Sequence, residues 1–201
     1  MKRRSIVLIL ALLLAAGRGA NAQARRIEPA EVRCPSVLGV GINTDLAFCD
    51  VLIQRDAGQG ILVVLPSYRG DATISFNLHN RHTYSEEEER SGRAYAQYLA
   101  SVAVATMAGD ILTKGIVMSE FRSAFDLVDR VSGGAGPGGR KAIAPTGRER
   151  VFVTVAENIE QISIVGQGLE VRRSDSRDIF NSIGRPVAVI SDVQVEYSPR
   201  R

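Results

Sequence analysis

The sequence predicts a mainly β protein: a β-sandwich of the immunoglobulin-like or jelly-roll-like kind with one short helix, following a cleaved signal peptide. Three observations predict this class. The chain begins with basic residues and a short apolar run. Many short alternating or apolar segments follow, separated by Gly, Asn, Asp and Pro, which is typical of a sandwich or barrel. The 201 residues contain only two cysteines, at a spacing that suits a disulfide.

Residues 1–22 are typical of a secretory signal peptide. Basic residues at 2–4 precede an apolar run at 6–16, and small residues follow in A-x-A steps. The run is shorter than the about 20 residues that a transmembrane helix needs. We therefore expect cleavage after Ala22 or Ala24 and a periplasmic or secreted protein without a lipid-anchor cysteine. An uncleaved N-terminal anchor is the alternative.

The net charge of the chain belongs to this leader. The whole sequence has 25 basic and 22 acidic residues, a formal charge of +3. Four of the basic residues lie in the signal segment, so the remaining chain is nearly neutral. A neutral chain gives no electrostatic reason to expect a nucleic-acid partner or an anionic membrane.

Cys34 and Cys49 are predicted to form a disulfide. In an oxidising compartment two cysteines tend to pair. A zinc site usually needs four Cys or His ligands, and the only histidines, His79 and His82, are far away in the sequence. A redox pair would usually be C-x-x-C. We expect the disulfide to tie an N-terminal arm, residues 23–45, onto the first strand.

The next residues are expected to form a hairpin and an amphipathic strand. Residues 46–56 and 61–66 are apolar segments joined by a probable turn at 57–60. Residues 71–80 alternate between apolar and polar types, as a half-buried strand does. Its inward side chains are predicted to be Ile74, Phe76 and Leu78, and its outward side chains Thr73, Ser75 and Asn77.

Two segments are ambiguous between helix and strand. Residues 93–108 fit either, and we favour a strand that turns at 107–110 into a second strand at 111–121. Residues 119–134 have apolar side chains at helical spacing and a glycine stop, which predicts the one short helix here.

Residues 132–140, SGGAGPGGR, are expected to form a loop that could separate two subdomains. Four further strands are expected after it. Because four strands alone would leave an apolar face uncovered, we favour a single sandwich domain over residues 46–197. Residues 198–201 are expected to be a frayed tail.

Few residues are candidates for chemistry, and no catalytic, metal or cofactor site is predicted. His79 and His82 would point to opposite faces of a strand, and we expect solvated histidines at a loop edge. The acidic run at 86–89 is expected to be a solvated loop or a helix start rather than a calcium site. Asp175 and Asp178 are expected in a loop with local ion pairs.

Three residues are candidate ligand contacts: Tyr68, Arg69 and Tyr84. The segment LPSYRGD is bounded by Pro and Gly and could present Tyr68 and Arg69 to a ligand, although an ordinary hairpin connection with a half-buried tyrosine is the favoured explanation. The chain has no tryptophan, which weakens the case for carbohydrate binding.

These observations favour an exported, non-catalytic sandwich that binds a protein or an envelope component through loops or a sheet edge. A carbohydrate-binding module is the first alternative. A hydrolase with an unrecognised site, using Asp175 and Asp178 or His79, is the second. An envelope glycan is a possible partner, and copies of the chain could also associate through strand edges.

Overall fold

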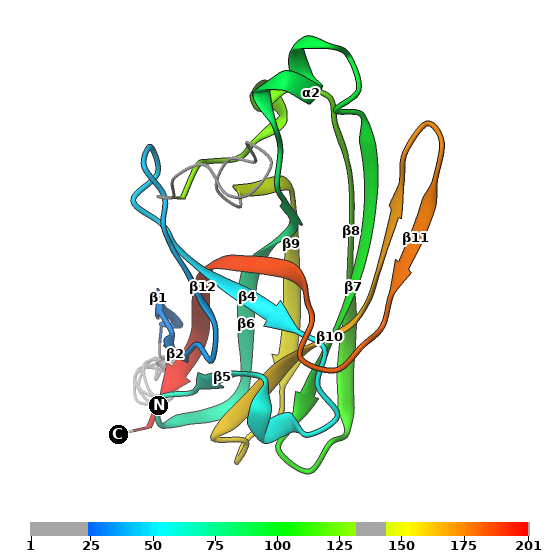
Figure 1. Ribbon diagram of the computed structural model, residues 1–201. Coiled ribbons are helices and arrows are strands. Elements are labelled where there is room, and N and C mark those ends of the chain that lie inside the picture. The colour runs from blue at the N-terminus through cyan, green and yellow to red at the C-terminus, as the bar shows by residue number, and fades with distance from the viewer. Residues whose placement is uncertain (1–23, 132–143, 201) are drawn as a thin grey trace, which may run out of the picture.

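The computed structural model describes residues 24–131 and 144–200, which form two antiparallel sheets packed face to face (Figure 1). The predicted mainly β fold is therefore confirmed. The predicted signal peptide and the glycine-rich segment 132–140 lie outside the described residues. Within the described part of the chain, no helix is both long and apolar enough to cross a membrane.

Sheet A contains six strands in the order β3-β4-β12-β6-β9, with β1 paired to β12. In chain order they are β1 (Arg26–Pro29), β3 (Val37–Val40), β4 (Ala47–Leu52), β6 (Tyr68–His82), β9 (Ala144–Val155) and β12 (Pro186–Pro199). Strand β6 is the longest, and β12 and β9 flank it on its two sides.

Sheet B also contains six strands, in the order β2-β5-β10-β7-β8, with β11 paired to β10. In chain order they are β2 (Glu31–Arg33), β5 (Ile61–Val64), β7 (Ala96–Thr106), β8 (Ile111–Phe121), β10 (Gln161–Arg172) and β11 (Arg177–Phe180). Strands β9 and β12 of sheet A and β10 and β11 of sheet B all follow the glycine-rich segment. Residues from both sides of that segment therefore share both sheets.

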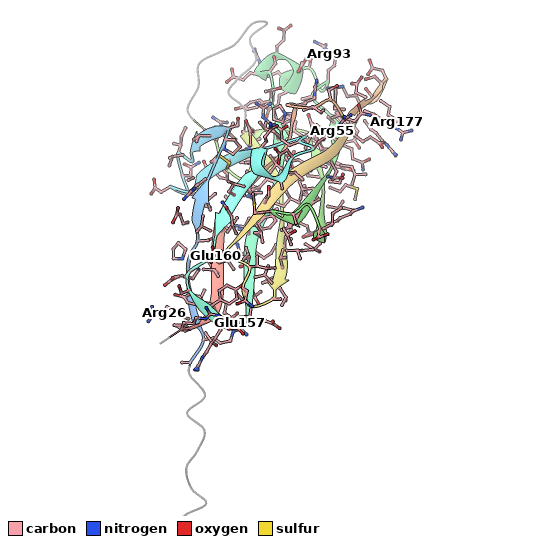
Figure 2. The ribbon with its side chains drawn as sticks, turned by 90° about the horizontal axis from the view of Figure 1, so that it is seen from below. Arg26, Arg55, Arg93, Glu157, Glu160 and Arg177 are labelled. Atoms are coloured by element: carbon pink, nitrogen blue, oxygen red, sulfur yellow. A yellow bond between two sulfur atoms is a disulfide. The ribbon has the colours of Figure 1, made fainter. Side chains whose placement is uncertain are left out.

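The hydrophobic core lies between the sheets, and β6 shows how the sequence builds it. Ile74, Phe76 and Leu78 are fully buried in this core, as their alternation predicts. Valines of β7 face them from sheet B. Charged side chains such as Arg55 lie at the periphery of the sandwich (Figure 2).

The segment 93–108 contains the predicted strand, β7. It pairs with β8 along its whole length, with Leu99 opposite Met118. The main-chain N–H of Thr106 donates to the carbonyl of Asp110 and closes the predicted turn between them. A strand is favoured over a helix here because every second side chain of β7 is buried in the core.

The one short helix is present, but its predicted place was wrong. The helix is α2 (Glu86–Arg90), which Ser85 caps by accepting hydrogen bonds from the N–H groups of Glu87 and Glu88. The acidic run is thus a helix start, where glutamates are favoured by the helix dipole. Residues 119–121 instead end β8, and within the described residues 122–131 the helical structure is a short 3₁₀ turn, η3 (Ala124–Asp126).

The predicted hairpin over residues 46–66 was also wrong. Its two strands, β4 and β5, belong to different sheets. Between them the chain forms η2 (Ala57–Gln59), a 3₁₀ turn capped by the Asp56 carboxylate, which accepts a hydrogen bond from the N–H of Gly58. The turn residues at 57–60 predict where the chain reverses, but they do not say which sheet the following strand joins. Here that strand, β5, pairs with β10 of sheet B, with Ile61 opposite Ile164.

The N-terminal arm crosses between the sheets instead of lying on one strand. Its strands alternate: β1 pairs in sheet A, β2 in sheet B and β3 in sheet A again. The predicted disulfide between Cys34 and Cys49 is confirmed, with a Cα–Cα distance of 5.9 Å. It joins the residue after β2, a sheet B strand, to the middle of β4, a sheet A strand.

The C-terminal residues continue the last strand. Strand β12 continues through Pro199. The guanidinium of Arg200 lies 3.0 Å from the carboxylate of Glu157 in the turn after β9. Residues 198 and 199 pair with β6, so the tail has partners that the sequence did not lead us to expect. Arg201 lies outside the described residues.

Candidate functional site

The last strand, β12, changes its neighbour halfway along one edge. It pairs with β4 up to Ile190 and with β1 from Gln194 onward. Between these points Asp192 has a φ of 51°, in the left-handed region, which aspartate tolerates better than most residues. The pairing with β6 on the other edge also shifts register here. We call residues 191–193 the β12 bulge; it opens a gap between β4 and β1 in sheet A.

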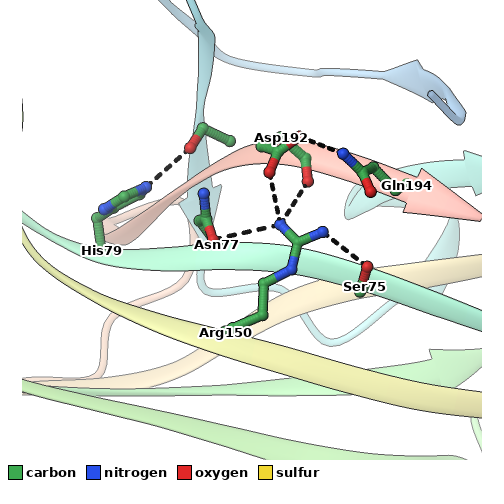
Figure 3. A network of polar contacts seen from close by, with 7 residues as sticks. Ser75, Asn77, His79, Arg150, Asp192 and Gln194 are labelled. Atoms are coloured by element: carbon green, nitrogen blue, oxygen red, sulfur yellow. Dashed lines mark hydrogen bonds and ion pairs between the residues drawn. The ribbon is translucent and has the colours of Figure 1, made fainter. Parts of the chain in front are cut away.

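A network of polar side chains holds the bulge on the outer face of sheet A, the face turned away from sheet B (Figure 3). Arg150 of β9 donates from Nη1 to Oδ2 of Asp192 at 2.8 Å and to its carbonyl at 2.9 Å. The same nitrogen lies 3.2 Å from Oδ1 of Asn77, and Nη2 donates to Oγ of Ser75 at 2.7 Å. Gln194 donates to Oδ1 of Asp192 at 2.9 Å. The guanidinium thus spans β6 to reach the bulge.

His79 continues this network toward the other end of β6. Its Nδ1 lies 2.7 Å from the carbonyl oxygen of Gly147, which can only accept, so Nδ1 carries the proton. Its Nε2 therefore accepts from the hydroxyl of Ser191, at 2.8 Å. Burial lowers the pKa of His79 below its ordinary value, although the bond to Gly147 opposes this shift. The imidazole is thus held neutral.

Both histidines differ from the prediction of solvated loop-edge side chains. Strand β6 extends through His82, and both side chains are buried. His79 lies on the outer face, where Phe48 packs edge-on against its ring. His82 lies on the core side and packs against the ring of Phe121. Segments distant in sequence cover both rings, so the local sequence could not show their burial.

Beside the bulge is a cleft of about 490 Å³. Three segments form it: residues of the N-terminal arm, the beginning of β4 and the β12 bulge. Its lining is mostly apolar, with Val32, Leu46 and Phe48 among the larger side chains. Asp45 and Asp192 also line it, and both have a positive φ. The volume lies in the range of natural ligand pockets, about 300–1,000 Å³.

Two tethers fix the walls of the cleft. The Cys34–Cys49 disulfide lines it directly. Farther out, the carboxylate of Asp129 accepts hydrogen bonds from the N–H groups of Asn43 and Thr44 and from the Thr44 hydroxyl. Burial of Asp129 raises its pKa, but these hydrogen bonds outweigh it, so the pKa lies below its ordinary value. The loop that leads into β4 is thereby held in place.

The structure does not bring the three predicted ligand contacts together. Tyr68 begins β6, and Tyr84 follows its other end, about 45 Å away for an extended strand. Tyr68 is 5% exposed, and its hydroxyl lies 2.6 Å and 2.8 Å from the carbonyl oxygens of Ala156 and Ile159. It also lines a hollow of about 250 Å³. Tyr84 is 4% exposed, whereas Arg69 is exposed.

The acidic residues form no metal site in the described part of the chain, where no three or more His, Cys, Asp or Glu side chains gather suitably. Asp178 lies in β11, not in a loop, and its carboxylate is 2.6 Å from the Arg173 guanidinium. Asp175 is exposed in the turn before β11. This arrangement matches the expected local ion pair.

Sequence reasoning missed the residues of the network and the cleft. One local signal was present: the polar pair Ser191–Asp192 interrupts the apolar run of β12, and such an interruption is typical of a bulge. No comparable signal marks Arg150, because its partners lie on two other strands.

The comparisons with known proteins give only distant likenesses. The K3 cleaved adhesin domain of Lys-gingipain from Porphyromonas gingivalis is similar at a TM-score of 0.34 and 12% identity, covering 76% of this chain and 74% of that chain. The K1 cleaved adhesin domain of the same protein is similar at a TM-score of 0.37 and 7% identity, covering 88% of this chain and 99% of that chain. The VP2 subviral particle of infectious bursal disease virus is similar at a TM-score of 0.25 and 10% identity, covering 88% of this chain and 33% of that chain.

No protein-family model matches the sequence, and no curated protein matches it. Because the TM-scores are low, the fold assignment rests on the strand pairing of this chain alone.

Proposed function

We propose that the chain is an exported, non-catalytic binding module that holds a short extended segment of a partner protein in the cleft beside the β12 bulge. The observation that carries this proposal is the coincidence of an apolar cleft with a gap in a sheet. Strand addition and side-chain pockets together are a recurring way of recognising extended peptides.

The gap supplies the main-chain part of such recognition. Within the described residues, 191–193 form no ladder pair with β4 or β1. Two of their carbonyl groups have partners: that of Val193 accepts from the N–H of Ala30, and that of Asp192 accepts from Arg150. Three residues of a strand span about 10 Å. A partner segment of two or three extended residues therefore fits between the two strands.

The cleft supplies the side-chain part. A volume of about 490 Å³ is large enough for two or three apolar side chains, and its lining offers them mostly apolar contacts. Export is part of the proposal: the predicted leader and the disulfide both fit an oxidising compartment, the periplasm or the outside of the cell. The disulfide also keeps the walls of the cleft together before any ligand arrives, which limits the entropy lost on binding.

The test is selection from a displayed library of random peptides on the exported chain. We expect enriched peptides to carry large apolar side chains and to bind the isolated protein in solution. Ala47 is exposed and lines the cleft, so Ala47→Trp fills the cleft with little cost to folding and should abolish this binding.

Ala108 provides the matched control. It is also exposed but lies in the turn between β7 and β8, so Ala108→Trp should leave peptide binding unchanged. The proposal is wrong if no peptide is enriched, or if the enriched peptides bind the Ala47→Trp variant as well as the unaltered protein.

A further inference from the structure

The outer face of sheet A carries an exposed aromatic ring beside the polar network. Phe152 of β9 is 66% exposed and lies directly opposite Ser75 of β6. Arg150, two residues earlier on the same strand, points to the same face and donates to Ser75. A phenylalanine left this exposed in the middle of a strand leaves a flat apolar surface open to a ligand.

The polar groups next to this ring are fixed and still able to bond. Asp192 accepts one hydrogen bond at each carboxylate oxygen from the side chains of Arg150 and Gln194, which uses about two of its four acceptor positions. The hydroxyl of Ser75 accepts from Arg150 and keeps its own proton to donate. These side chains already hold one another in place through their hydrogen bonds, so a ligand loses little entropy in ordering them.

Two ion pairs lie beside the ring. Arg150 lies 2.8 Å from Asp192, and Arg25 lies 2.7 Å from Glu196 nearby on β12. The groups next to the ring are amides, hydroxyls and carboxylates, and the two ion pairs beside it are each neutral. Such a surface suits a neutral ligand with many hydroxyl groups.

We propose that this face binds a neutral oligosaccharide, with one pyranose ring stacked on Phe152 and its hydroxyl groups bonded to the network around Arg150 and Asp192. The spacing fits this arrangement. Residues two apart on a strand are separated by about 7 Å, the scale of one sugar ring and its hydroxyl groups. The site adjoins the proposed peptide cleft and shares Asp192 with it, whereas Phe152 and Arg150 do not line the cleft.

The experiment measures binding of soluble oligomers of glucose, mannose and N-acetylglucosamine to the exported chain by titration calorimetry. We expect at least one oligomer to bind and Phe152→Ala to weaken it by about tenfold or more, because the stacked apolar area is lost. Phe152→Trp should bind as tightly or more tightly. Phe125 is 98% exposed in η3, so Phe125→Ala is the matched control and should change nothing.

Two results would overturn this inference: no oligomer binds, or Phe152→Ala binds sugar as the unaltered protein does. If no sugar binds and Phe152→Ala loses peptide binding, the face belongs to a protein partner. The Ala47→Trp variant separates the two proposals, because it should abolish peptide binding and leave sugar binding intact.

Discussion

The Nη1 atom of Arg150 lies 2.8 Å from Oδ2 of Asp192, across the intervening strand β6. This contact joins β9 to the bulge of β12, at the residue whose φ lies in the left-handed region. Each of the two side chains is about one-third exposed or less. Both binding surfaces proposed above depend on the shape of the bulge, so they depend on this pair.

Removal of the Asp192 side chain should destabilise the fold. Asp192→Ala leaves the partly buried guanidinium of Arg150 without its carboxylate and places alanine at a positive φ. We expect a loss of about 1–3 kcal/mol in the free energy of unfolding, measured with urea. Asp192→Asn tolerates the same backbone conformation and should cost less; an equal loss in the two variants would refute the strain argument.

Loss of the disulfide should destabilise the protein and weaken the cleft. The bond closes a loop with a sequence separation of 15 residues, which corresponds to about 3 kcal/mol in the chain-entropy model. We expect the double variant Cys34→Ala, Cys49→Ala to lose a free energy of this order and to bind selected peptides more weakly. An unchanged urea midpoint would show that the arm is held without the bond.

Asp129 should contribute stability that disappears in acid. Its pKa is lower in the folded protein than in the unfolded chain, so the carboxylate binds fewer protons when folded. The contribution is therefore fully present above the unfolded value of about 4 and is lost as the pH falls through the folded value. Asp129→Asn should lack this acid-dependent part of the urea stability; if both proteins show the same pH dependence, the assignment is wrong.

His79 should make the protein less stable as the pH falls below neutrality. Its pKa is lower in the folded state, so the unfolded chain takes up a proton near pH 6.5 that the folded protein takes up only at lower pH. In that window stability should fall by up to about 1.4 kcal/mol for each pH unit. Arg148 nearby adds to the shift. The effect is isolated by measuring the free energy of unfolding in urea as a function of pH for the unaltered protein and for His79→Gln. The same pH dependence in the two proteins would contradict the prediction.

The sequence was sufficient for the parts of the fold that local periodicity controls. The alternation of Ile74, Phe76 and Leu78 predicts which side of β6 enters the core, and the turn at 107–110 predicts the β7–β8 pair. The same reasoning failed over residues 46–66, because a reversal of the chain does not say which sheet the next strand joins. It failed over 119–134 because Phe125 is 98% exposed and so does not form the expected apolar stripe.

The candidate site was beyond sequence reasoning for a related reason. The cleft combines the N-terminal arm with β4 and β12, and the polar network combines β6, β9 and β12. No pattern within a single segment records that these strands are neighbours. Tyr68 illustrates the converse: its place in a Pro/Gly-bounded segment suggested a ligand contact, and its hydroxyl is bonded to the turn after β9.

The most direct test of the proposed binding module is a map of amide chemical-shift changes as a selected peptide is added to the exported chain. We predict that the largest changes fall in residues 46–49 and 190–193, on the two sides of the cleft, and that the turn at 107–110 does not respond. Changes centred on another surface, with residues 190–193 unmoved, would contradict the account.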